Sequence, residues 1–415
     1  MSSTAPAPSP SPASAYATAG SSEFSRINRA MLCAGFAAFA LLYCVQPLMP
    51  QLGAQFSLTP AQSSWSLSAS TLALAVSLVL SGVLSDRIGR KKLMVIALLS
   101  AAVVTALSAL AQSFTQLLVL RSLAGFALGG MPAVAMAYLS EEIEPRSLGL
   151  AMGIYIGGTA VGGTFGRMAA SFISDHYSWR LAMVVMGVAG LAAAWEFWRS
   201  LPQSRRFQPA RPGWRALADG ARAHLADAGL RWLFVFGFLV MGVFVSLYNY
   251  ISYRLLDAPY GLGESAVGAV SILYLVGIGS ALWAGRLADR IGRRHVLWVA
   301  VVIMFGGLLL TLAGSLVVII AGLAVFTFGF FASHSVASSW VGRRAGPPQA
   351  LASALYLFFY YLGSSVLGSL CGTVWSGAGW VGVVALLALV LALAVAVAVH
   401  LRALAPLPAL VGATA

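Results

Sequence analysis

Charged side chains are scarce in this sequence. Asp, Glu, Lys and Arg together make up 9% of its 415 residues, whereas hydrophobic residues make up 60%. No charged residue occurs from Ala30 to Ser85, a stretch of 56 residues. Two membrane spans of about 20 residues and a short turn fit in that length. The composition therefore excludes an ordinary water-soluble domain and indicates a membrane protein.

Acidic residues and cysteines are rarer still. The sequence has 12 Asp and Glu residues against 25 Lys and Arg, which gives a formal net charge of +13. The bases stand in short clusters between apolar runs, as on the cytoplasmic side of membrane proteins, so we expect no nucleic-acid partner. Cys33, Cys44 and Cys371 lie inside apolar segments without metal-binding spacing. We interpret them as packing residues, and we expect no metal site and no cofactor.

The N-terminus has neither the basic start nor the apolar centre of a signal peptide. Residues 1–25 consist mainly of Ser, Ala and Pro, which predicts a disordered cytoplasmic tail. We expect a second cytoplasmic tail at 403–415.

One charged segment occurs twice. GVLSDRIGRKK, Gly82 to Lys92, returns 203 residues later as GRLADRIGRRH, Gly285 to His295, with seven of eleven positions identical. Each copy interrupts a long apolar run. Internal repeats in a membrane protein are typical of secondary transporters. The sequence therefore predicts two homologous halves and a small-molecule substrate.

Hydropathy over a window of about 19 residues predicts twelve transmembrane helices. We expect an all-α membrane protein built from two pseudo-symmetric six-helix bundles, at 26–198 and 231–402. The spans of the first bundle are predicted at 30–51, 62–84, 93–112, 116–139, 148–172 and 180–198. Those of the second bundle are predicted at 231–255, 264–285, 296–313, 315–338, 350–374 and 379–400.

The distribution of Lys and Arg predicts the orientation. With the N-terminus inside, 21 of the 25 bases fall on the cytoplasmic side. Arg180 and Arg254 fall in outer loops, whereas Arg121 and Arg167 fall inside spans. This asymmetry predicts a multi-pass protein of the bacterial inner membrane with both termini in the cytoplasm. We expect it to act as a monomer.

A polar segment at 199–230 is predicted to link the bundles. Leu217, Ala221 and Leu225 recur in steps of four, with Arg215 and Arg222 between them. This pattern predicts an amphipathic helix on the inner membrane surface, its bases toward anionic lipid. The helix would act as a tether, or alternatively as a regulatory binding site.

The repeated charged segment could act as a conformational latch or only as a cluster that sets topology. Asp86 lies near the edge of the hydrocarbon, where a carboxylate needs a partner such as a neighbouring Arg or a helix N-terminus. Gly89 permits a turn that a residue with a side chain would resist.

The paired G-x-L-x-D-R-x-G-R-R/K segments, in a chain of twelve predicted spans with a central linker, resemble the diagnostic loop of the major facilitator superfamily. This resemblance implies two bundles that rock about a central cavity by alternating access. It also implies that Gly82, Asp86, Arg87, Gly89 and Arg90 steady the outward-facing state. We extend the latch prediction to the equivalent residues of the second copy: Gly285, Asp289, Arg290, Gly292 and Arg293.

Finer resemblances point to export. LYCVQPLMPQL, Leu42 to Leu52, and GIYIGGTAVGGTFGR, Gly153 to Arg167, are similar to bacterial drug-efflux members, particularly the acriflavin-sensitivity branch. Arg121 and the glycines after it are similar to the fourth-span motif of proton-coupled members. The fifth span departs from the antiporter motif, because Gly157-Gly158 stands where that motif has Gly-Pro.

The arginines inside spans are candidates for substrate binding or coupling, because a charge within the membrane is costly. Arg121 and Arg167 both fall in the outer half of the membrane, in the first bundle. Snorkelling to the outer headgroups is the alternative. Beside the polar stripe that ends in Arg167, three glycines predict a packing face for another helix: Gly158, Gly162 and Gly166.

No predicted span has a carboxylate in its middle, so the two arginines favour an anionic or neutral amphiphilic solute. Other candidates are polar or aromatic residues on helices expected to line the cavity: Tyr43, Gln46, Tyr248, Asn249, Tyr274, His334, Tyr356 and Tyr360. His334 could also titrate.

We predict a secondary transporter that exports a small organic solute by exchange with protons. An importer or uniporter for an organic anion is the alternative within that class. A sensor or scaffold on the same fold is disfavoured because both charged turns are complete. An enzyme is disfavoured because neither half contains a nucleophile–base pair, a metal-ligand cluster or a phosphate loop.

Overall fold

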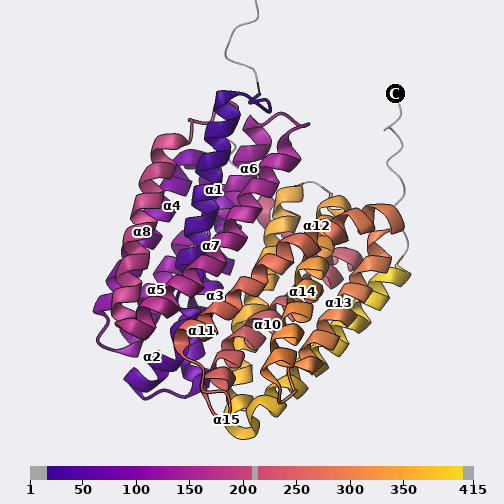
Figure 1. The fold of residues 1–415 in the computed structure, drawn as a ribbon. Helices are drawn as coiled ribbons and strands as arrows, with labels where there is room; N and C mark the ends of the chain where they lie inside the picture. The colour runs from indigo at the N-terminus through magenta and orange to yellow at the C-terminus, as the bar shows by residue number, and fades with distance from the viewer. Residues whose placement is uncertain (1–15, 208–213, 347, 405–415) are drawn as a thin grey trace, which may run out of the picture.

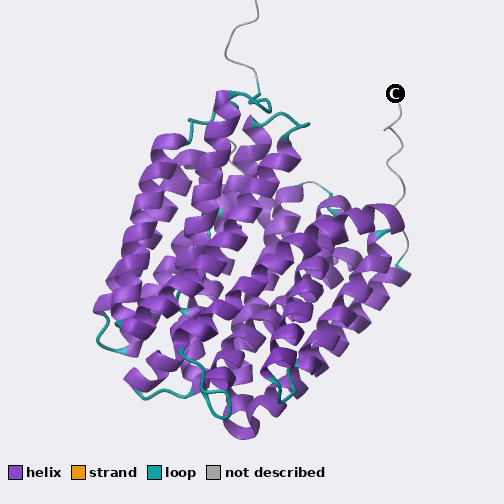
Figure 2. Ribbon diagram, in the orientation of Figure 1, coloured by secondary structure: helices purple, strands orange, loops and turns teal. Residues whose placement is uncertain are grey.

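The computed structural model describes residues 16–207, 214–346 and 348–404. Within these ranges the chain is helical apart from turns and short loops, and it contains no strand (Figure 2). The predicted tails lie largely outside the described residues. Of the first tail, Ala17 exchanges backbone hydrogen bonds with Glu142 and Glu144. The first helix begins at Ser22, ahead of the predicted boundary at residue 26.

Two bundles of helices lie side by side (Figure 1). The first comprises α1 (Ser22–Tyr43), α2 (Met49–Phe56), α3 (Pro60–Ile88), α4 (Arg90–Leu107), α5 (Phe114–Leu128), α6 (Pro132–Glu142), α7 (Leu148–His176) and α8 (Trp179–Ser200). The linker helix α9 (Trp214–Ala226) precedes the second bundle. That bundle comprises α10 (Ala228–Leu256), α11 (Glu264–Ala269), α12 (Tyr274–Ile291), α13 (Arg293–Leu310), α14 (Leu316–Arg344) and α15 (Gln349–Ala403).

The described chain has 11 helical segments long and apolar enough to cross a membrane. The last of them, α15, turns at Gly379, whose φ of 58° and ψ of −153° are not helical. Because α15 thus forms two spans, the predicted architecture of twelve transmembrane helices is confirmed. The turn also coincides with the predicted start of the last span at 379.

Two spans of the first bundle are interrupted. The first span breaks after Tyr43 and resumes through the 3-10 turn η2 (Gln46–Leu48) into α2. Pro47 and Pro50 lack the N–H groups that a continuous helix would need here. The fourth span breaks between α5 and α6, where Pro132 starts a new helix. The predicted spans at 30–51 and 116–139 do not show these breaks. Broken helices are typical of transporter binding sites, because they free backbone groups inside the membrane.

Glycines bring α7 against α1. A Cβ at Gly158, Gly162 or Gly166 would meet the backbone of Leu32, Phe36 or Ala40, respectively. This confirms the predicted packing face, and it fixes the helix that carries Arg167 against the first span.

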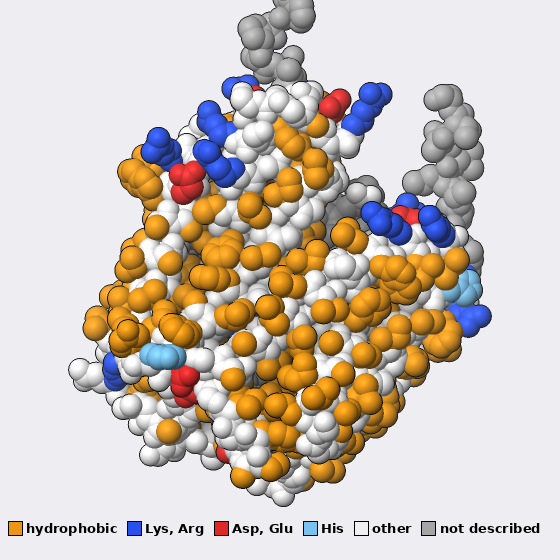
Figure 3. Space-filling view, viewed as in Figure 1, with side chains coloured by type: hydrophobic (Ala, Val, Ile, Leu, Met, Phe, Trp, Pro, Cys, Tyr) orange, Lys and Arg blue, Asp and Glu red, His pale blue; other side chains and the backbone are white. Residues whose placement is uncertain are grey.

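Both bundles carry their charged turns at the same end of the molecule. Figure 3 shows the Lys and Arg side chains concentrated there, and Figure 1 shows α1 beginning and α15 ending there. We call this end, with the turns at 86–92 and 289–295, the basic end, and the other the opposite end. The bundles diverge toward the basic end in Figure 1. Between them the surface is notched in Figure 3.

The linker helix α9 packs against the second bundle. Leu217 and Ala221 contact its core, and His224 lies 3.2 Å from the carbonyl of Pro348. Protein therefore covers this side of the helix. Arg215 and Arg222 remain exposed and available to lipid headgroups.

Candidate functional site

Arg167, on α7, lies between the two bundles and is 4% exposed. Its guanidinium is sandwiched between two rings, 4.1 Å from the centroid of Tyr43 and 4.6 Å from that of Tyr274. Nε donates to the Gln46 side chain at 2.5 Å, and Nη1 donates to the Gly163 carbonyl at 2.7 Å. In the described chain these acceptors are neutral, and no Asp or Glu forms an ion pair with Arg167. The guanidinium thus holds an uncompensated positive charge inside the protein.

Gln46 joins Arg167 to the second bundle. Its Nε2 donates to Oδ1 of Asn249 at 2.7 Å, and both residues are buried. A cavity of about 20 Å³ lies beside this chain of contacts, lined in part by Gln46, Arg167, Tyr248 and Ser252. That volume suffices for about one water molecule. The described conformation therefore leaves room for solvent at Arg167 but not for an organic solute.

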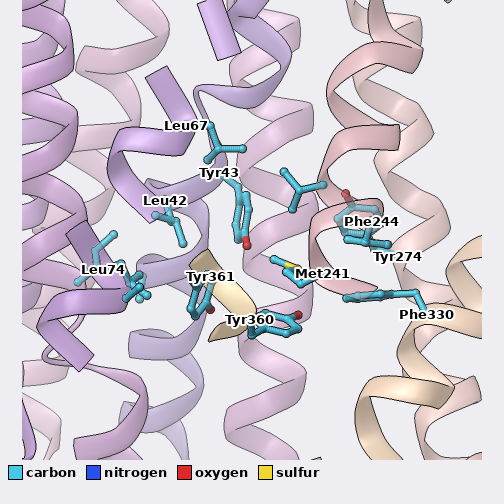
Figure 4. Close-up of a cluster of buried hydrophobic side chains, with 14 of the residues drawn as sticks. Leu42, Tyr43, Leu67, Leu74, Met241, Phe244, Tyr274, Phe330, Tyr360 and Tyr361 are labelled. Carbon is cyan, nitrogen blue, oxygen red and sulfur yellow. The ribbon is translucent and has the colours of Figure 1, made fainter. Parts of the chain in front are cut away.

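Aromatic rings of the second bundle continue the site toward the basic end. Figure 4 shows Tyr43, Tyr360 and Tyr361 across from Phe244, Tyr274 and Phe330, with Met241 among them. Phe244 stacks on Phe330 with ring centroids 3.7 Å apart. The rings offer flat apolar surface next to the guanidinium of Arg167, as a pocket for an amphiphile requires.

His334, on α14, also belongs to this aromatic cluster. Its Nδ1 lies 3.0 Å from the Tyr356 hydroxyl, and its ring centroid lies 4.6 Å from that of Tyr360. Tyr248 instead pairs its hydroxyl with Thr327 at 2.7 Å. The structure thus brings the candidate residues of the predicted cavity together, except for Arg121.

Arg121, on α5, is fully buried at 0% exposure. Nη1 donates to the carbonyl of Leu41 at 3.2 Å, and Nη2 donates to the carbonyl of Leu42 at 2.7 Å. Both acceptors belong to the last turn of α1, where helical carbonyls lack partners. Arg121 therefore holds the broken end of the first span, and it reaches neither the headgroups nor the aromatic cluster.

The two charged turns have the same backbone form. Gly89 has φ 93° and ψ 146°, and Gly292 has φ 91° and ψ 141°. Positive φ favours glycine at both positions. In each copy the arginine after the glycine forms an ion pair with the aspartate four residues before that arginine. Arg90 pairs with Asp86 at 2.6 Å, and Arg293 pairs with Asp289 at 2.8 Å.

The two turns differ in the further residue that their arginine contacts. Arg90 also binds Glu141 of α6 at 2.8 Å, whereas Arg293 donates to Ser339 of α14 at 3.0 Å. The first turn is therefore a network of one base and two acids that joins three helices of its bundle, α3, α4 and α6. The second has a single ion pair, whose Asp289 is 63% exposed.

Side-chain hydrogen bonds join the bundles near the middle of the molecule and at the opposite end. Near the middle, Thr71 and Ser365 pair at 2.8 Å. At the opposite end, Ser63 pairs with Tyr253 at 2.6 Å, and Gln51 donates to Glu264 at 2.9 Å. Together with the divergence at the basic end, these contacts describe a molecule that is closed at the opposite end.

Comparison with known proteins identifies the family. A model of the Major Facilitator Superfamily matches residues 31–366. The chain belongs to the Major Facilitator Superfamily. The MFS-type transporter YybF of Bacillus subtilis is 47% identical over 375 residues, which cover 90% of this chain and 93% of YybF. The inner membrane transport protein YnfM of Escherichia coli is 46% identical over 371 residues, 89% of each chain.

A solved structure shows the same fold. A bacterial homologue of the human lysosomal transporter Spinster, in an inward-facing and unoccupied conformation, aligns with a TM-score of 0.77 at 18% identity. The alignment covers 92% of this chain and 98% of that one. The family model and the two relatives show that this member of the Major Facilitator Superfamily is a multi-pass membrane transporter and not an enzyme.

Several residues of the site were not among the predicted ones. Phe244 and Phe330 lie one helical turn before Tyr248 and His334, so the four-residue period of the predicted positions would have identified both. No pattern in the sequence singled out Glu264, because an acid just before a span is usually an exposed loop residue.

Proposed function

We propose that this transporter exports a small organic anion with a flat apolar body, in exchange for protons. The main observation in support of this proposal is the buried guanidinium of Arg167, which has no counter-ion in the described chain. A buried charge without a counter-ion is costly, and an anionic group of the substrate would supply the missing partner. The rings of Tyr43 and Tyr274 cover the guanidinium. An anion would therefore approach its edge while its apolar body contacts the aromatic cluster.

Unpaired hydrogen-bond donors support an anionic ligand. Asn249 Nδ2 and the hydroxyls of Tyr155 and Tyr274 are buried without a partner in the described structure. A carboxylate is acceptor-only, so it complements such donors. A cation would add a second positive charge beside Arg167.

Export is supported by resemblance and by the membrane potential. The basic end is the predicted cytoplasmic side, so closure at the opposite end is the state from which an exporter would load its substrate. The first and fifth spans resemble the acriflavin-sensitivity branch of drug exporters. An inside-negative potential also drives an anion outward and a proton inward, by about 2.3 kcal/mol per charge per 100 mV.

Proteoliposomes loaded with aromatic carboxylates, their neutral esters or cationic amphiphiles would test this function under proton gradients of either sign. We expect carboxylates to move against protons and Arg167→Gln to raise their KM about 100-fold, since losing a buried charge pair costs roughly 2–5 kcal/mol. Arg402→Gln, at an exposed position, is the matched control.

Preference for cations, or a native KM for carboxylates in Arg167→Gln, would overturn the anion proposal. Movement of carboxylates together with protons would instead establish the alternative direction, import of an organic anion through the same site.

A further inference from the structure

Glu264 is held by the first bundle although it belongs to the second. It is the first residue of α11, and its Oε2 accepts a hydrogen bond from Nε2 of Gln51 at 2.9 Å. Its backbone carbonyl accepts a hydrogen bond from the Ser171 hydroxyl at 2.5 Å. Ser174 donates in turn to the Gln51 side chain. Several of the hydrogen bonds that close the opposite end thus converge on one acidic residue.

A second carboxylate faces the same contact from α7. Oδ2 of Asp175 accepts from the backbone N–H of Ser265 at 3.1 Å and from its hydroxyl at 2.6 Å. A Cβ on Gly263 would lie 3.7 Å from the same oxygen. Asp175 therefore lies close to Gly263 and Ser265, the residues directly before and after Glu264. Small residues allow this approach, because a Cβ on Gly268 would collide with the Ser171 side chain.

Among the described residues, no Lys or Arg forms an ion pair with either acid. In the described chain Glu264 forms no ion pair, and α2 carries no charged residue. Other charged or titratable groups lie nearby on the neighbouring elements: His176 on α7 and Tyr177 after it, Tyr253 and Arg254 at the end of α10, and Asp257 and Tyr260 in the loop before α11. Tyr253 pairs with Ser63, and Arg254 donates to the carbonyl of Ala313. The Nδ1 of His176 lies 3.0 Å from the carbonyl of Phe172 in its own helix. Glu264 is thus partly buried next to another acid and paired only with neutral groups.

From this geometry we infer that Glu264 is a proton-dependent lock of the opposite end. Closing the bundles over an ionised Glu264 partly buries its charge and brings it next to Asp175, which stays exposed to water. Both the partial burial and the neighbouring negative charge disfavour the closed state. A proton on Glu264 removes the repulsion and keeps the hydrogen bond with Gln51, whose amide can donate or accept. Closure therefore takes up a proton, and loss of that proton favours opening to the outside. The inference does not depend on the identity of the substrate.

A thiol placed behind the lock would report its opening. Ser252 lines the cavity of about 20 Å³ beside Arg167 and is 8% exposed. With Cys33, Cys44 and Cys371 replaced by Ala, Ser252→Cys is the sole thiol. A membrane-impermeant maleimide added outside intact cells would reach it only when the opposite end opens. Tyr177→Cys, at a position 73% exposed at the same end, normalises for the pH dependence of the thiol reaction.

We expect normalised labelling of Ser252→Cys to rise several-fold from acidic to alkaline external pH. Glu264→Gln, the isosteric mimic of the protonated acid, should keep labelling low at every pH. Glu264→Ala, which removes the lock, should keep it high at every pH. Asp257→Asn, at an exposed acid of the adjacent loop, should preserve the native response.

A native pH response in Glu264→Gln, or pH-independent labelling in the native background, would overturn the lock. The assay needs neither substrate nor turnover. If labelling responds to pH but the protein moves no organic anion, only the proposed function is contradicted. If the protein moves organic anions but labelling does not respond to pH, only the lock is contradicted.

Discussion

At the scale of single residues, the two arginines inside the membrane have different surroundings. Arg167 touches both bundles through Gln46 and Tyr274, and its charge is uncompensated. Arg121 lies wholly within the first bundle and donates to two carbonyls at the end of α1. We therefore assign Arg121 a positioning role. It holds Tyr43, the next residue of that helix, against Arg167.

Lysine should not replace Arg121. A guanidinium donates to two adjacent carbonyls from one plane, whereas an ammonium is a single point of charge. Loss of a buried hydrogen bond from a charged group costs about 1.5–3 kcal/mol. We expect Arg121→Lys and Arg121→Ala to lower both the melting temperature in detergent and transport at matched membrane levels. Arg402→Lys, at an exposed position outside both charged turns, should change neither. Full activity and stability in Arg121→Lys would show that only a positive charge is needed.

At the scale of elements, the two charged turns share a backbone but not a network. Arg90 joins Asp86 on α3 to Glu141 on α6, so the first turn ties two helix ends of its bundle together. In the second turn a serine stands where the first has Glu141. The extra ion pair makes the first turn the firmer support for a latch.

Asp86→Asn should lower transport sharply while leaving membrane insertion intact, because it removes the charge and keeps the shape. Asp289→Asn should have a smaller effect, since its acid is mostly exposed and has one partner. Transport rates at matched membrane levels would test the order. Equal rates in Asp86→Asn and the native protein would refute a latch role for the first turn.

Asp227 caps α10 outside the membrane and should make stability depend on pH. Burial opposes its charge, but hydrogen bonds from Arg344 and the Leu230 amide hold its pKa below the ordinary value. The stabilisation is therefore complete above the unfolded pKa of about 3.9 and is lost as pH falls through the folded pKa. Asn caps a helix about as well as Asp, so Asp227→Asn removes mainly the charge that pairs with Arg344. We expect this variant to melt at a lower temperature at neutral pH, with a cost of about 1 kcal/mol, and the difference to shrink in acid.

Thermal unfolding in detergent across a pH series would measure this difference. Asp219→Asn is the matched control, because Asp219 is 71% exposed on the linker helix. A gap between native and Asp227→Asn that stays constant with pH would contradict the charge-based explanation.

At the scale of the whole molecule, the sequence was sufficient for the architecture and insufficient for the contacts between bundles. Uncharged runs of the sequence predict the membrane spans, and the repeated charged turn predicts the two homologous halves. The break after Tyr43 also has a local cause in Pro47, which could have been recognised. The meeting of Gln51 with Glu264 could not, because it depends on which conformation brings the two bundles together. The stacking of Tyr274 on Arg167 likewise joins residues of separate bundles.

The linker should influence how the molecule sits on lipid without changing what it carries. Arg215 and Arg222 are exposed on α9, whose apolar side packs on the second bundle. Replacing both with Gln should weaken attachment to anionic lipid by about 1 kcal/mol per charge. We expect stability to depend less on the anionic lipid content of the vesicles, with an unchanged substrate profile. A changed profile would place the linker on the substrate route.

The hydrogen bond between Gln46 and Asn249 joins residues separated by 203 positions, the same interval that separates the two charged turns. Equivalent positions of the two halves therefore touch each other, as residues on the dyad of a symmetric dimer do. A side chain on a dyad meets its own copy, so two acids or two bases there would repel. A carboxamide both donates and accepts, so it is complementary to itself. Exchanging the pair, Gln46→Asn with Asn249→Gln, should thus be tolerated better than carboxylates at both positions, a trace of the symmetry from which the two halves diverged.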